Sequence, residues 1–169
     1  MTPTRKNAMP AIPTPLVDSY LDHLDPVAQQ AWAEIDASEL EQERARVAPR
    51  IAERLTQPTH GVGKRLRAWE RLGARLAAFG QTADDYYLID EYINDLDIRD
   101  ALERLRAQLP AEPRAVFDNL LHQLDQRFRD VTEDDGGQAL RWRLNESAIA
   151  TALRSWWWQR RPTKVPWTL

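Results

Sequence analysis

Apolar residues spaced three or four positions apart run through most of this 169-residue chain, and they constrain its fold more than any other feature. The first such stripe consists of Leu16, Tyr20, Leu24, Val27, Ala31 and Ile35. Similar stripes recur over residues 64–79, 88–109 and 113–124. Because this spacing places apolar side chains on one face of a helix, the sequence predicts an all-α fold, an irregular bundle of about six to seven helices.

Polar residues and prolines indicate where the first helices begin and end. Proline lacks a backbone donor and fits the first turn of a helix, so Asp25-Pro26 is expected to interrupt the first stripe. Ser38 precedes Glu41 by three positions, the spacing of a capping box. This spacing predicts that a separate helix starts after Ser38 and covers residues 39–55.

The segment 88–109 carries two apolar stripes. One comprises Leu88, Ile89, Tyr92, Ile93 and Leu96, and the other comprises Ile98, Leu102, Leu105 and Leu109. On one straight helix these stripes fall on opposite faces, and a core on one side would bury only one of them. We therefore predict a break or kink at Leu96-Asp97.

The C-terminal third is less regular. Apolar residues alternate with arginines over residues 138–144, which is typical of a strand. Residues 127–144 are therefore expected to form either a short β-hairpin around Gly136-Gly137 or two helices. A further helix is expected from Glu146 to Trp158.

The sequence predicts two parts of unequal size. Residues 1–15 are expected to form a flexible, proline-rich arm. Residues 16–169 are expected to form a single helical domain that ends in an extended tail. This length is close to the usual size of one domain.

Composition excludes several kinds of chemistry. The chain has no cysteine, which removes disulfides, thiolate metal sites and cysteine nucleophiles. No apolar run approaches the roughly 20 residues that a bilayer crossing needs, so we expect a soluble, cytoplasmic protein with no membrane partner. No catalytic residue, metal ligand or cofactor-binding residue is assigned, because no nucleophile elbow, complete phosphate loop or carboxylate–histidine motif is present.

Carboxylates nevertheless leave one enzymatic alternative open. Glu91 and Asp95 lie one helical turn apart, and Glu39 and Glu43 repeat this spacing on another predicted helix. Together these oxygens could hold Mg²⁺. The alternative function is therefore a metal-dependent, all-α hydrolase of a phosphorylated small molecule.

Acidic side chains are concentrated in residues 84–103, which hold eight Asp and Glu residues against one base, Arg99. A solvated helix that pairs with the basic residues 44–75 would explain this pattern simply. A tyrosine exposed among carboxylates suits instead a surface that attracts a basic partner and then anchors it. The predicted partner-binding residues are Asp84, Tyr87, Glu91, Asn94 and Asp95.

The preferred hypothesis is a non-enzymatic bacterial protein-binding module, immunity- or antitoxin-like, that covers a basic protein partner with this face. Nucleic-acid binding is not favoured, because the net charge of the chain is −3. A further alternative is a structural adaptor that forms a homo-oligomer through its tryptophan-rich end, Trp156-Trp157-Trp158. Within that run, Trp156 is expected in the core and at least one neighbour is expected to be partly exposed or covered by the tail.

Overall fold

Seven α-helices, two short 3-10 helices and two β-strands make up the computed structural model, which describes residues 15–81, 86–165 and 167. The α-helices are α1 (Leu16–Leu21), α2 (Pro26–Ala45), α3 (Pro49–Ala52), α4 (Val62–Ala78), α5 (Ile89–Gln108), α6 (Ala111–Asp130) and α7 (Glu146–Ala152). The shorter elements are β1 (Thr132–Asp134), η1 (Gln138–Leu140), η2 (Trp156–Gln159) and β2 (Arg160–Pro162). The predicted all-α bundle is confirmed. The predicted arm, apart from Pro15, lies outside the described residues.

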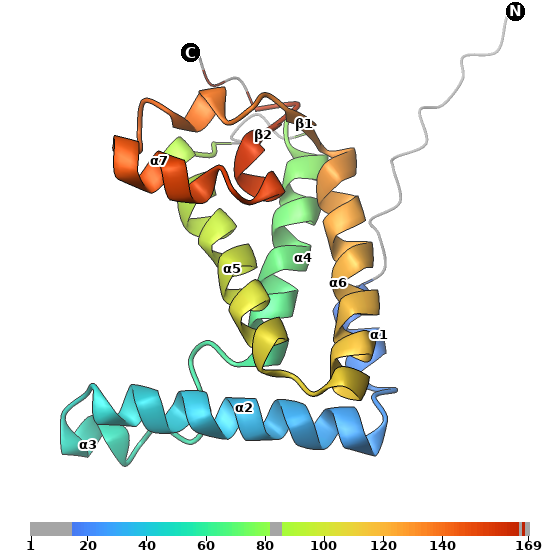
Figure 1. Cartoon of the computed structure of the whole chain (residues 1–169), viewed down its shortest axis with the longest axis vertical. Coiled ribbons are helices and arrows are strands. Elements are labelled where there is room, and N and C mark those ends of the chain that lie inside the picture. The colour runs from blue at the N-terminus through green and yellow to red at the C-terminus, as the bar shows by residue number, and fades with distance from the viewer. Residues whose placement is uncertain (1–14, 82–85, 166, 168–169) are drawn as a thin grey trace, which may run out of the picture.

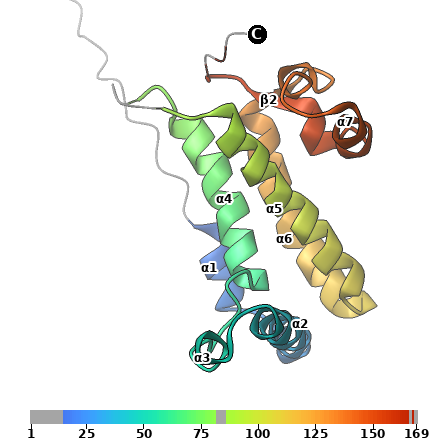
Figure 2. The same cartoon turned by 90° about the vertical axis from the view of Figure 1, so that its left-hand side faces the viewer.

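The three long helices α4, α5 and α6 form the body of the bundle (Figure 1). Helix α2 crosses one end of this body, and α7 lies at the opposite end with the two strands. Helix α1 packs beside the half of α4 that is nearer to α2 (Figure 2). Large rings fill the interior: Trp69 and Phe128 have ring centroids 4.6 Å apart, and Trp32 meets Phe117 edge-on at 5.8 Å.

The predicted boundary at Asp25-Pro26 is confirmed, but the boundary at Ser38 is wrong. Asp25 caps α2 by accepting hydrogen bonds from two backbone N–H groups, and Pro26 is the first helical residue. The helix then continues through Ser38 to Ala45, because no proline or glycine lies between these two residues. Tertiary contacts also hold this stretch, since Asp36 accepts a 2.7 Å hydrogen bond from the backbone of Val62 at the start of α4.

The predicted kink at Leu96-Asp97 is also wrong, because α5 is one helix from Ile89 to Gln108. The prediction assumed that the core lies on a single side of this helix. In the structure, α5 contacts α4, α6 and η2, so different faces are buried along its length. Arg99, only 5% exposed, continues the buried surface from Leu96 to Leu102.

A small sheet is present, but its second strand lies outside residues 127–144. β1 pairs antiparallel with β2, with Thr132 opposite Pro162 and Asp134 opposite Arg160. The alternating residues form the 3-10 helix η1 and a turn instead, because Gly136 and Gly137 adopt left-handed conformations that redirect the chain after β1.

The helix expected to reach Trp158 ends at Ala152, and the tryptophan run forms η2. Trp157 and Trp158 are buried, whereas Trp156 is half-buried beneath the guanidinium of Arg129, 3.9 Å from its ring centroid. The prediction that Trp156 is the core residue of this run was therefore wrong. Among the described helices, none combines the length and apolar character that crossing a membrane requires.

Candidate functional site

The sequence-predicted binding face is not an exposed surface with a tyrosine at its centre. Tyr87 is only 3% exposed, which contradicts the expected outward-facing anchor. Its ring packs near Tyr92 and Trp167, with centroid separations of 6.2 and 6.0 Å, and Arg75 covers it at 4.2 Å. The prediction failed because the C-terminal tail, far away in sequence, supplies Trp167 to bury this ring.

The neighbouring predicted residues are partly paired within the chain. Tyr87 donates a 2.6 Å hydrogen bond to Asp95, and Arg75 forms a 3.5 Å ion pair with Glu91. Asn94 is exposed, and Asp84 lies outside the described residues. Burial raises the pKa of Asp95, against the opposing effects of the Tyr87 hydrogen bond and Arg75. This face therefore uses its polar groups largely to hold residues 86–88 against α4.

Replacing Tyr87 by phenylalanine should lower the free energy of unfolding by about 1–2 kcal/mol, because Asp95 then loses a donor while the ring packing is kept. Urea unfolding of the two proteins measures this difference. Tyr86→Phe is the matched control. Because Tyr86 is exposed, the loss of its hydroxyl should change stability little. Equal stability of the Tyr87→Phe variant and the unmodified chain would contradict the hydrogen bond.

The carboxylates of the proposed hydrolase site have separate partners. Glu39 pairs with Arg65 at 3.1 Å. Glu43 accepts hydrogen bonds from the backbone of Thr59 and His60, which lower its pKa. In the part of the chain that the structure describes, no group of three or more His, Asp or Glu side chains is arranged to hold a metal ion.

A second acidic surface, which sequence reasoning missed, lies on the C-terminal half of α5. Here a groove of about 790 Å³ separates α5 from α7 and η2. We call it the α5–α7 groove. It is lined by Ile93, Asp97, Asp100, Glu103, Arg104, Leu144, Asn145, Ala148, Thr151, Ala152, Ser155, Trp157 and Trp158.

Asp100 connects α5 to the tryptophan run. Its two carboxylate oxygens accept hydrogen bonds from the indole N–H groups of Trp157 and Trp158, at 2.9 and 3.0 Å. Both rings are buried, so these donors would be costly to leave unpaired. The pairing fixes η2 against α5 and thereby forms one end of the groove.

Next to the tryptophan end of the groove, a buried ion pair links α5 to α6. Arg99 donates to both oxygens of Asp125, at 2.9 and 3.0 Å, and Trp69 donates to the same carboxylate at 3.0 Å. The Arg99 guanidinium also lies 4.4 Å from the centroid of Trp157. The groove thus borders a buried charged network that joins α4, α5 and α6.

Asp97 is the carboxylate of the groove that remains open to a ligand. Within the described part of the chain, it accepts no hydrogen bond and belongs to no ion pair, whereas Glu103 bonds Arg99 and Arg106 at 3.0 Å each. Partial burial raises the pKa of Asp97, the nearby charge of Asp100 raises it further, and the charge of Arg104 opposes both effects. A cation bound here would favour the ionised form of Asp97.

The spacing of Asp97 and Asp100 signals a shared helix face, but the sequence could not show what lies opposite that face. The contacts between Asp100 and the tryptophans span 57 and 58 residues. Comparisons of the chain with protein-family models, with curated proteins and with solved structures find no match. The functional argument therefore rests on the chemistry of the groove.

Proposed function

We propose that the chain is a non-enzymatic protein-binding module that receives a cationic side chain of a partner protein in the α5–α7 groove. The observation that supports this proposal is the Asp97–Asp100 pair on the wall of a large groove, with Asp97 unpaired in the described chain. The proposed role remains immunity- or antitoxin-like, in which the partner is a basic toxin. The binding residues differ from those inferred from sequence.

The groove suits the arginine or lysine side chain of a partner. Long basic side chains bury an apolar stem and keep their charged end paired or hydrated. Ile93, Leu144 and Ala152 supply an apolar lining for the stem, and Asp97 supplies a carboxylate for the charged end. Arginine forms two parallel hydrogen bonds with such a carboxylate, so we expect arginine to bind more tightly than lysine.

Calorimetric titration with an arginine-rich peptide tests this proposal. We expect saturable binding that weakens about tenfold or more when Asp97 is changed to lysine, because the new charge repels the ligand. Glu34→Lys is the control, since Glu34 is an exposed acid on α2 and the charge change is the same. If both variants lost the same peptide affinity, the loss would be explained by net charge alone, and this result would contradict the proposed site.

Peptide affinity should rise as the pH is raised from about 4 to about 7. The raised pKa of Asp97 keeps part of this carboxyl protonated at mildly acidic pH, and the cation binds the ionised form. Arginine stays charged throughout, so binding should release protons. Calorimetry at several pH values measures this dependence. Asp97→Asn should abolish most of this pH dependence. An unchanged pH profile in that variant would contradict the role of Asp97 as the binding carboxylate.

A further inference from the structure

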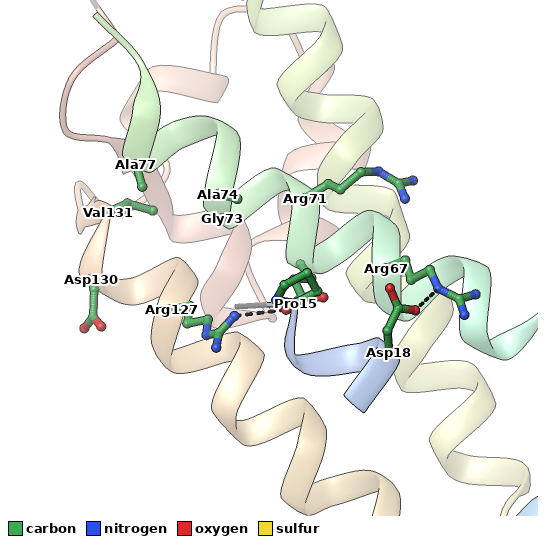
Figure 3. Close-up of a pocket in the computed structure, with 11 residues that line it drawn as sticks. Pro15, Asp18, Arg67, Arg71, Gly73, Ala74, Ala77, Arg127, Asp130 and Val131 are labelled. Atoms are coloured by element: carbon green, nitrogen blue, oxygen red, sulfur yellow. Dashed lines mark hydrogen bonds and ion pairs between the residues drawn. The ribbon is translucent and has the colours of Figure 1, made fainter. Parts of the chain in front are cut away.

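A second groove, on another face of the molecule, lies between α4 and α6 (Figure 3). It has a volume of about 460 Å³. Its apolar floor is formed by Gly73, Ala74 and Ala77 of α4 together with Val131, and Pro15 lies at its centre. We call it the α4–α6 groove.

Four of the six charged residues around this groove form two ion pairs with one another. Asp18 pairs with Arg67 at 2.6 Å, and Glu70 pairs with Arg127 at 2.9 Å. Glu70 additionally accepts the backbone N–H groups of Leu16 and Val17. Of the other two, Asp130 accepts a 2.8 Å hydrogen bond from Gln126, and Arg71 points away from Pro15 (Figure 3). The groove therefore presents an apolar floor to its occupant.

The first residues of α1 contact α4 at successive positions that lead toward this floor. Going backward along the chain, Asp18 contacts Arg67 of α4, and Leu16 contacts Glu70, one turn further toward the C-terminus of α4. Pro15 then lines the groove beside Gly73 and Ala74. Pro15, the first described residue, thus lies in the groove, and the order of these contacts runs along α4 in the direction of Ala77.

We propose that residues 9–14 of the same chain occupy the α4–α6 groove. These residues, Met-Pro-Ala-Ile-Pro-Thr, carry no charge, and each of their two prolines lacks a backbone N–H that would need a partner in an apolar groove. The lengths agree: a polyproline segment from Leu16 back to Ile12 would span about 12 Å, and Ala77 lies about 10 Å from Glu70 along α4. This inference is independent of the proposed function.

Cysteine cross-linking in the full chain tests this placement, and the absence of native cysteine makes the result unambiguous. The variant Ile12→Cys with Ala77→Cys should form an intramolecular disulfide under mild oxidation. The control is Ile12→Cys with Ala78→Cys, because Ala78 is the next residue of α4 but is exposed and does not line the groove. We expect the first pair to cross-link at least about tenfold faster, since only its geometry permits a disulfide.

Equal rates for the two pairs would overturn the proposal, and so would disulfides formed only between molecules, because a second copy would then supply the arm. Charge in the groove provides an independent check. Adding Ala74→Glu to the Ile12/Ala77 pair should slow cross-linking, whereas adding Ala78→Glu should not, because Ala74 is on the apolar floor. Circular dichroism of each variant establishes that the fold is retained.

Discussion

Replacing Asp125 by alanine is expected to lower the free energy of unfolding by about 3–5 kcal/mol, the usual consequence of leaving one charge of a buried pair without its partner. The side chains of Arg99 and Asp125 are only 6% and 9% exposed. The substitution would remove two hydrogen bonds from Arg99 and one from Trp69. Urea unfolding measures this loss.

Asp118→Ala is the matched control for this substitution. Asp118 is also an α6 carboxylate that bonds an α5 arginine, Arg106, but both side chains are partly exposed. Exposed pairs contribute about 0–1 kcal/mol, so the control should change stability little. The double substitution Arg99→Met with Asp125→Leu should recover part of the loss, because it removes both buried charges. Similar costs at Asp118 and Asp125 would contradict the buried network.

Replacing Asp100 by alanine is expected to lower the free energy of unfolding by about 2–4 kcal/mol, because two indole N–H groups lose their acceptor at once. The carboxylate is half-buried, which limits the cost below that of two fully buried hydrogen bonds. We also expect Trp157 and Trp158 to become more accessible, since their bonds to Asp100 hold η2 against α5. Urea unfolding and fluorescence quenching by acrylamide measure the two effects.

Asp97→Ala is the control for Asp100→Ala. It removes an acid one turn earlier on the same wall of the groove. Since burial already disfavours the charged form of Asp97, its removal should leave stability unchanged or slightly raised. Equal destabilisation by both substitutions would show that Asp100 has no special role in holding the tryptophans.

Local patterns in the sequence predicted much of the bundle. The stripe over 64–79 anticipated α4 (Val62–Ala78), and the stripe over 113–124 anticipated the buried face of α6, where Phe117 and Leu124 lie. Asp25-Pro26 predicted the start of α2 because a cap and a proline act within one turn of the helix. Caps and prolines can be recognised without knowing which other helix packs against the segment.

The errors arose where burial depends on distant parts of the chain. Arg99 reads as a surface residue, yet Asp125 of α6 pairs with it inside the core. Its burial lets α5 continue past the predicted kink. Ser38 has the spacing of a cap, but the continuous helix is held by contacts such as Asp36 with the start of α4.

The same difficulty affected the binding site. An acidic α5 was evident from composition, but which of its residues face outward depended on the C-terminal segment. Trp167 covers Tyr87, while Trp157 and Trp158 complete a groove beside Asp97. Contacts between residues so far apart in the sequence cannot be predicted from local patterns. The expected oligomer interface at the tryptophan-rich end remains an untested prediction, although two of its three rings are buried within this chain.

The most direct test of the proposed function follows the indole N–H signals of Trp157 and Trp158 by ¹⁵N NMR during titration with an arginine-rich peptide. Both groups bond Asp100, so a cation entering the α5–α7 groove should shift these two signals most among those of the seven tryptophans. The shifts should saturate in the unmodified chain and in Glu34→Lys, and disappear in Asp97→Lys. Shifts confined to other tryptophans, or shifts that persist in Asp97→Lys, would contradict the proposed site.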